Sequence, residues 1–340
     1  MGYPLRIQHE ESIYFVTNRC LQERFLMQPD DPYVVQLCRG ALVMAAKKHK
    51  VEVFTFVFMG NHYHLVVRAP LLNLDVFMQQ FQGQLARRIN RHRGRHGTFF
   101  GGRYTYAPIL DQEQLAQKVV YTLLNPVAAG LVEHPRHWPG ASAYEGHLSG
   151  QPIEGRWMDF EQVARYGRKH GLRGQVLYND AILDDMFFDE MSLELAPLPL
   201  WEGEGLDGCQ KAARLEQMVE EGLEVLLERD KPSLGDAGAK ARCAVLQCWS
   251  ARPKNPKRGG PKPLCHASSR RQRQIYRAYY TQCVQSYRSA RAAFLAEPSL
   301  PHRFPHGMIP CVISKSLVRG QAHHGQKVRY GPDGWSVWGD

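Results

Sequence analysis

The sequence of 340 residues lacks any apolar run close to the roughly 20 residues that a membrane-spanning helix needs. Its first residues, MGYPLRIQHEES, lack the apolar stretch of a signal peptide. The eight cysteines form no Cys-x-x-Cys pair, which argues against a zinc ribbon and against a disulfide framework. We therefore expect a cytoplasmic protein with reduced thiols and no membrane partner.

Acidic residues are missing from two long stretches, although the net charge is only +10. Residues 84–106 contain six arginines and no acid, and residues 250–294 contain eleven lysines or arginines and no acid. Residues 180–228 hold fourteen acids and two bases. A solvated surface usually mixes both signs, so this segregation predicts two surfaces for nucleic acid. Basic stretches that serve solubility alone are the alternative.

Residues 1–147 read as one compact α+β unit. The patterns predict strands over 12–19, 51–59, 63–68 and 104–110, and helices over 31–50, 73–92 and 112–124. The Gly60-Asn61 turn should make the second and third strands antiparallel neighbours, and Pro126 should end the last helix. This order is that of a ferredoxin-like antiparallel sheet with helices on one face. The fold alone implies no chemistry.

The rest of the chain predicts a mainly helical C-terminal extension. Residues 148–230 form its first part, with expected helices over 159–168, 180–195 and 206–229, the last of them acidic. Residues 231–340 form its second part, with a basic linker over 231–264, a basic helix over 268–297 and a tail without a clear element.

The segment MGNHYHLVV places His62 and His64 two residues apart on an expected strand. Alternate strand residues point to the same side, so the two imidazoles can share a cation. A His-x-His pair taken alone is more often incidental than a metal site.

The segment KVVYTLLNPVAAGLV places Tyr121 and Asn125 four residues apart, on one face of an expected helix. An amide oxygen can complete a two-histidine metal site while the phenol lies beside a metal-bound phosphate. On the spacing alone, the preferred interpretation is structural: Tyr121 packs in the core and Asn125 ends the helix.

Three motifs taken together resemble a known family. MGNHYHLVV, then RRINRHRGRHGTFFGGRY, then YTLLNPVAAGLVEHPRHWPGASAY occur in the order found in the REP-associated tyrosine transposases, a branch of the HUH single-tyrosine transposases. The resemblance covers about residues 5–147 and implies that Tyr121 is the nucleophile. It also implies that His62, His64 and Asn125 bind the metal. Tyr63 occupies a place that is usually aliphatic, but it should point to the opposite face.

The resemblance further implies a chemistry and a substrate. Tyr121 would cut single-stranded DNA through a 5′-phosphotyrosine link that later permits strand joining, and the DNA would be a hairpin formed by a REP-type palindrome. The donor set suits Mg²⁺ or Mn²⁺. The protein would be a nucleoid-associated monomer or homodimer. The residues expected to contact DNA phosphates are Arg87, Arg88, Arg91, Arg95 and Arg103. Nearby aromatic residues, Phe99 and Tyr104 among them, are candidates for base stacking or for packing.

Three other functions stay open from the sequence. An HUH nickase of rolling-circle replication would share the histidine pair, although the residues after Tyr121 argue against it by resemblance. A DNA-hairpin-binding regulator would keep the fold with an idle site. A basic RNA-binding protein would account for the charge alone.

Overall fold

The computed structural model describes residues 5–171, 187–229, 248–251, 263–297, 302–308, 326–331 and 334–339. Its N-terminal part contains β1 (Ile13–Arg19), α1 (Pro32–His49), β2 (Glu52–Phe58), β3 (His62–Arg68), α2 (Leu74–His92), β4 (Thr105–Ile109) and α3 (Gln112–Leu123). The short 3-10 helix η1 (Leu21–Glu23) follows β1. The four strands and three helices predicted for this part, and their order, are confirmed.

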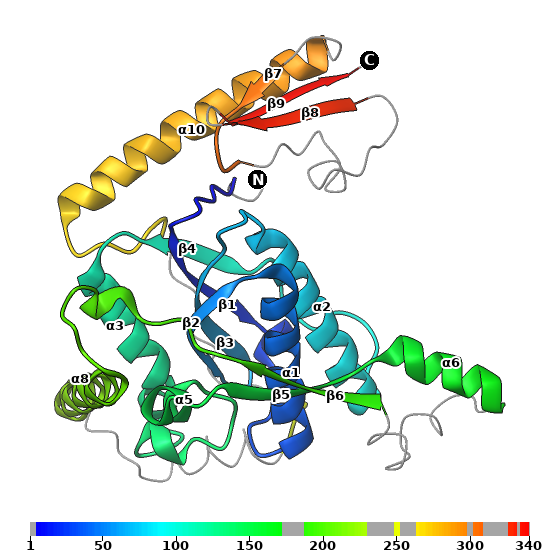
Figure 1. Cartoon of the computed structure of the whole chain (residues 1–340), viewed down its shortest axis with the longest axis vertical. Coiled ribbons are helices and arrows are strands. Elements are labelled where there is room, and N and C mark those ends of the chain that lie inside the picture. The colour runs from blue at the N-terminus through cyan, green and yellow to red at the C-terminus, as the bar shows by residue number, and fades with distance from the viewer. Residues whose placement is uncertain are drawn as a thin grey trace.

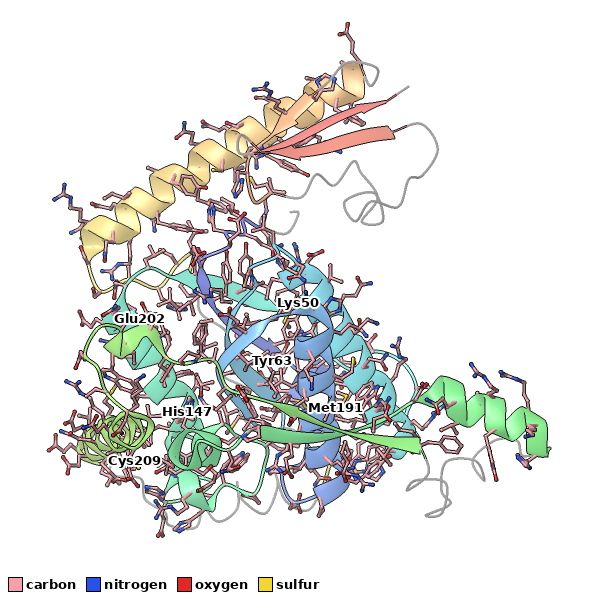
Figure 2. All side chains as sticks on the ribbon, viewed as in Figure 1. Lys50, Tyr63, His147, Met191, Glu202 and Cys209 are labelled. Atoms are coloured by element: carbon pink, nitrogen blue, oxygen red, sulfur yellow. The ribbon has the colours of Figure 1, made fainter. Side chains whose placement is uncertain are left out.

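The four strands form one antiparallel sheet in the order β2-β3-β1-β4, seen behind α1 and α2 in Figure 1. On β3, Tyr63 is fully buried and packs against Phe81 of α2, with ring centroids 5.3 Å apart; Figure 2 labels it in the interior. The next residue, His64, faces the other side of the sheet and packs against Tyr121 of α3. The long helices α1 and α2 thus cover one face as predicted, and α3 lies against the other.

The end of α3 differs in detail from the prediction. The helix ends at Leu123, but a further helical turn, α4 (Asn125–Ala128), begins at Asn125. Pro126 is tolerated because it lies in the first turn of α4, where no backbone N–H has to be donated within the helix. Asn125 is therefore helical and buried rather than a terminating loop residue.

The C-terminal extension is more mixed than predicted. It is preceded by η2 (Pro135–His137) and by α5 (Tyr144–Ser149), which spans its expected start. Its described elements are β5 (Ile153–Met158), α6 (Phe160–His170), β6 (Phe188–Leu193), η4 (Pro199–Trp201), α8 (Gly208–Arg229), α10 (Arg270–Ala296), β7 (His302–Phe304), β8 (Gln326–Gly331) and β9 (Gly334–Gly339). The helices predicted over 159–168, 206–229 and 268–297 are confirmed. The helix predicted over 180–195 is wrong where it is described, because residues 188–193 form β6; residues 180–186 lie outside the described residues, as does most of the 231–264 linker. The described strands of the tail form a three-stranded sheet in the order β7-β9-β8.

The extension packs tightly on the N-terminal part. β5 pairs with β6 and lies against α1, where a side chain on Gly40 would collide with the backbone carbonyl of Arg156. Trp201 and Val219 are buried in the same core cluster as the sheet. The domain boundaries expected at 147 and 230 stay predictions. Across the described ranges, we find no helix with the length and apolar character required to span a membrane.

Candidate active site

The two expected metal ligands, His62 and His64, lie on β3 with ring centroids 5.0 Å apart. The Nδ1 atom of His62 is 2.7 Å from the Oδ1 atom of Asn61. Both ring nitrogens of His64 are buried and have no hydrogen-bond partner among the described residues. Burial lowers the pKa of His62 to about 3 and that of His64 well below its usual value. Both imidazoles are therefore neutral, which is the form that binds a cation.

Asn125 and Tyr121 reach the same place from the helical side. The Oδ1 atom of Asn125 is 3.2 Å from the Nε2 atom of His62. The Tyr121 ring lies edge-on to the His64 ring, with centroids 5.3 Å apart. Asn125 is only 8% exposed, whereas Tyr121 is 46% exposed. The fold thus brings together the four residues that the sequence motifs single out, and leaves the phenol open to a ligand from solvent.

The donor atoms of this cluster can be tested against a divalent cation. A buried imidazole with two unsatisfied nitrogens is costly unless something else binds it, and His64 is such a group. Within the described ranges, no three His, Cys, Asp or Glu side chains gather as a possible metal site. The two histidines would therefore need the Asn125 amide oxygen to make three ligands, a mixed N and O set that fits Mg²⁺ or Mn²⁺.

Two further side chains surround Tyr121. Lys118 lies one turn before Tyr121 on α3, and its Nζ atom is 5.2 Å from the centre of the Tyr121 ring and 5.1 Å from that of Phe15. His266 makes no ring contact with Tyr121 in the described part of the chain but lies edge-on to Phe15, which packs against Tyr121, with the His266 and Phe15 ring centroids 5.5 Å apart. Burial lowers the pKa of Lys118, and burial followed by the nearby Lys118 charge lowers that of His266 to about 4.

Sequence reasoning missed both residues. Lys118 could have been found, because a spacing of three places it on the helix face of Tyr121. No sequence signal identifies His266, which reaches the site because its backbone pairs with the edge of β4 through Pro108 and Leu110.

The five arginines expected at the DNA have different surroundings. Arg88 is 4% exposed, donates to the backbone carbonyl of Met158 and stacks 3.4 Å from the Trp157 ring. It is an interior residue joining α2 to β5, which corrects its expected role at a phosphate. Arg87, Arg91 and Arg103 are exposed, and the half-buried Arg95 donates to Asn90. For these four, DNA binding stays a prediction.

Two of the residues considered for base stacking are also interior. Phe99 is 2% exposed and belongs to the main core. Tyr104 is 8% exposed and lies beneath the guanidinium of Arg6. Both side chains are therefore packed in the interior and are not placed to stack on a base.

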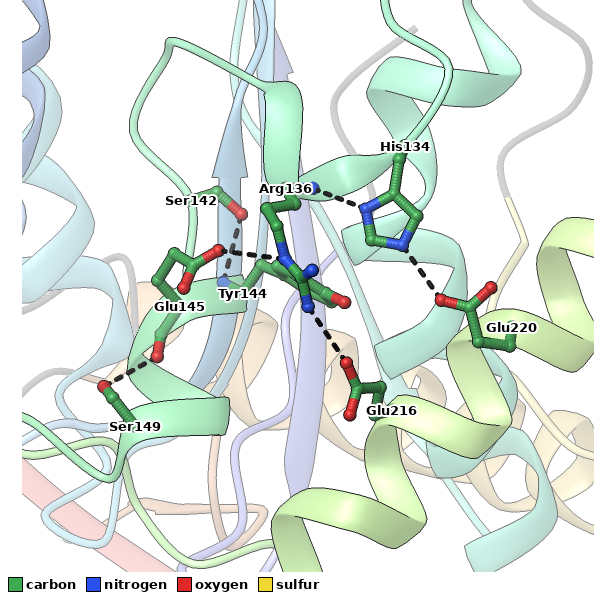
Figure 3. A network of polar contacts seen from close by, with 8 residues as sticks. All are labelled: His134, Arg136, Ser142, Tyr144, Glu145, Ser149, Glu216 and Glu220. Carbon is green, nitrogen blue, oxygen red and sulfur yellow. Dashed lines mark hydrogen bonds and ion pairs between the residues drawn. The ribbon is translucent and has the colours of Figure 1, made fainter.

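The acidic helix α8 packs against α3. Gly222 of α8 faces Val120 and Leu124, the apolar residues on either side of Tyr121 along α3. Figure 3 shows a polar border of α8, where it meets residues around η2 and α5. There Glu220 is 2.9 Å from His134, and Glu216 is 3.0 Å from Arg136.

The polar border adds little stability, since its carboxylates are exposed and such ion pairs each contribute about 1 kcal/mol or less. The apolar contact at Gly222 joins α8 to α3, which is also held by the buried side chains of Leu115, Val119 and Leu123 in the main core. Two acidic side chains of α8, Glu216 and Glu220, thus face basic residues of the chain itself.

Comparison with known proteins identifies the unit that carries the histidines. Residues 23–119 match the family model described as Transposase IS200 like. The chain carries an IS200-like transposase domain. This domain is of the single-tyrosine type within the HUH tyrosine transposases, which act in DNA transposition. The matched range includes His62 and His64 and ends just before Tyr121.

Solved structures give more distant similarities. A REP-associated tyrosine transposase bound to a REP hairpin is 18% identical with a TM-score of 0.38, over 44% of this chain and 86% of that one. A candidate transposase from Deinococcus radiodurans R1 is 15% identical with a TM-score of 0.25, over 35% of this chain and 92% of that one. Among curated proteins, none is similar enough to the chain to count as a match.

Proposed function

We propose that this IS200-like transposase domain cuts and rejoins single-stranded DNA with Tyr121 as its nucleophile. The observation that carries the proposal is the cluster in which the exposed Tyr121 ring lies against His64 while Asn125 contacts His62. A nucleophile next to three potential metal ligands is the arrangement that phosphodiester transesterification requires.

The chemistry needs no external energy source. The Tyr121 oxygen attacks the phosphorus and loses its proton to solvent, a tyrosine–phosphate bond forms on the 5′ side, and the bond to the 3′ oxygen breaks. The 3′ oxygen leaves as a hydroxyl after taking a proton. Attack of a 3′ hydroxyl on the phosphotyrosine reverses these steps and joins strands. A divalent cation, Mg²⁺ or Mn²⁺, held by His62, His64 and Asn125 would supply charge neutralisation at the phosphate.

Lys118 supplies a cation from the chain itself. Its ammonium group lies above the faces of Tyr121 and Phe15, and none of the described carboxylates forms an ion pair with it. A phosphate that approaches the Tyr121 hydroxyl therefore meets an ammonium group without a counter-ion among the residues that the structure describes. We assign Lys118 to stabilising the charge that develops on the phosphate during attack.

The proposed substrate is a hairpin formed by a REP-type palindrome. This part of the proposal rests on the three sequence motifs and their order. The exposed Arg87 and the other basic residues around the end of α2 provide a charged surface for the hairpin backbone. A DNA-binding regulator with the same fold would bind the hairpin and form no covalent product.

The test is covalent trapping. Purified protein with Mn²⁺ or Mg²⁺ should convert a labelled single-stranded hairpin into an adduct that survives SDS, and Tyr121→Phe should form none. His64→Ala should also form none while keeping most of its hairpin affinity, because the basic surface supplies the binding energy. Equal adduct from Tyr121→Phe would place the nucleophile elsewhere, and binding without any adduct in the unaltered protein would favour the regulator.

A further inference from the structure

A hollow lies beside β4, the edge strand of the sheet, and the start of α10. Figure 1 shows where these two elements lie. Its cavity volume is about 130 Å³. The side chains that matter here are Arg6, Arg103, Thr105, Tyr106, Tyr276 and Tyr280. We call this site the edge hollow. Tyr276 and Tyr280 belong to α10, which lies outside the residues that match the transposase family.

Strand register relates the edge hollow to the candidate active site. Thr105 of β4 is the partner of Thr17 on β1, and Thr17 is the partner of His64 on β3. The three residues therefore lie in one row across the sheet and point to the same face. Two strand spacings separate Thr105 from His64, or about 10 Å. Tyr104 and Tyr106 alternate with Thr105 along β4 and point to the opposite face, so Arg6, which stacks on them, lies on the side of the sheet away from His64.

The edge hollow contains positive charge. The Arg6 guanidinium stacks 3.5 Å from the Tyr104 ring and donates to the Tyr104 backbone carbonyl at 2.8 Å. Arg103 lies close enough to Arg6 for their charges to repel, and the carboxylate of Asp75 attracts Arg6 more weakly, without a described ion pair between them. A half-buried guanidinium beside a second one favours an anion in the space next to them.

The edge hollow also contains fixed aromatic rings. The hydroxyl of Tyr280 donates to the Leu5 carbonyl, and that of Tyr106 donates to the Ile7 carbonyl. Each ring is thus held in place by its hydroxyl. Tyr276 belongs to no described core cluster, although it lines the hollow. Rings fixed beside guanidinium groups are the combination that binds an unstacked base together with its phosphate.

We propose that the edge hollow binds one unpaired nucleotide of the DNA substrate, with its base on Tyr276 and Tyr280 and its phosphate facing Arg6 and Arg103. The proposal rests on the proposed function, because it takes single-stranded DNA as the ligand. It gives α10 a role in choosing a nucleotide of the single-stranded flank.

The experiment combines changes in the DNA with changes in the protein. Hairpins with a single-stranded flank would each carry one abasic site at a different flank position, and binding to the full-length protein would be measured with and without Tyr276→Ala. Loss of one stacked base should weaken binding of the unaltered protein about 10-fold at one flank position. Tyr276→Ala should weaken binding of the intact flank by a similar factor and remove the sensitivity at that position alone. Tyr276→Phe should behave like the unaltered protein.

Charge and location have their own controls. Arg6→Gln should reduce binding of the intact flank, whereas Arg291→Gln, which removes an exposed charge further along α10, should leave the abasic profile unchanged. A 5-iodouracil base at the sensitive position should crosslink to Tyr276 or Tyr280 on irradiation.

The outcomes separate the two proposals. A flat abasic profile in a protein that forms the Tyr121 adduct would overturn the edge hollow and leave the proposed function intact. An abasic profile with one sensitive position, in a protein that forms no adduct, would support the edge hollow and overturn the proposed function. Binding of a free mononucleotide to the hollow, with a flat profile for DNA, would also overturn the assignment.

Discussion

The contact between α8 and α3 can be tested with the substitution Gly222→Ala. A methyl group on Gly222 would lie 2.7 Å from the Cγ1 atom of Val120 and 2.8 Å from the Cδ1 atom of Leu124. Carbon atoms pack at about 3.5–4.0 Å, so the two helices must separate by roughly 1 Å. The end of the Leu124 side chain can rotate, but Val120 is β-branched and stiff.

Two opposing terms decide the stability of this variant. Overpacking costs about 1–3 kcal/mol, and replacing a glycine inside a helix returns about 1 kcal/mol. The free energy of unfolding should therefore fall by about 0–2 kcal/mol. The effect on activity should be larger, because Val120 is adjacent to Tyr121. A displacement of about 1 Å at a reacting group lowers rates about 100-fold.

The assays are urea unfolding and single-turnover formation of the covalent adduct. The matched control is Gly83→Ala in α2, where a methyl group would meet nothing within 4 Å. That control should gain up to about 1 kcal/mol and keep the normal adduct rate. If Gly222→Ala gains stability like the control and forms adduct at the normal rate, then α8 does not position α3 and our reasoning is wrong.

Three further predictions concern single side chains. Arg88→Ala should lower the free energy of unfolding by about 2–4 kcal/mol, because a stacked cation and the donor to a buried carbonyl are lost. The control Arg87→Ala should keep the normal free energy of unfolding and lower the slope of log hairpin affinity against log salt concentration by about one. If instead Arg88→Ala changes the salt slope and leaves stability unchanged, Arg88 belongs to the DNA surface. Lys118→Gln should slow adduct formation about 100-fold with little change in hairpin affinity, and an unchanged rate would remove its assigned role. Burial lowers the pKa of His147 to about 4 in the folded protein, whereas an unfolded histidine has a pKa of about 6.5. As the pH drops from about 6.5 towards 4, the unfolded chain takes up a proton at His147 that the folded chain does not, so the free energy of unfolding falls, by roughly 2 kcal/mol at pH 5. His147→Asn should reduce this acid sensitivity in urea unfolding at pH 7 and pH 5, and an equal loss in both proteins would assign the sensitivity to other groups.

Much of the fold could be predicted because local patterns and packing agree. The β2–β3 pair follows from two apolar strands joined at Gly60 and Asn61. The beginning of α1 follows from Asp31, whose side chain accepts from the backbone N–H groups of Tyr33 and Val34 as expected of an N-cap residue. Where these cues exist, the expected bounds lie within one or two residues of those in the structure.

The predictions were wrong where a long-range contact decided the outcome. Residues 188–193 contain spaced apolar side chains that suit a helix, but they pair with β5 as an edge strand. Arg88 looks like its neighbours in a basic stretch, but the fold places it under Trp157. Spacing gives no information about which face of a basic helix is later covered by a segment 70 residues away.

The sequence by itself determined the set of reactive groups in the transposase domain and their local spacing. Strand alternation places His62 and His64 on one side, and helical periodicity places Lys118 on the face of Tyr121. Only the tertiary structure decided that these two local arrangements meet, that His266 packs on the neighbouring Phe15, and that α8 packs against the helix on which Tyr121 lies. The physical reason is that periodicity fixes the direction of a side chain relative to its own element, whereas the distance between elements depends on how the whole core packs.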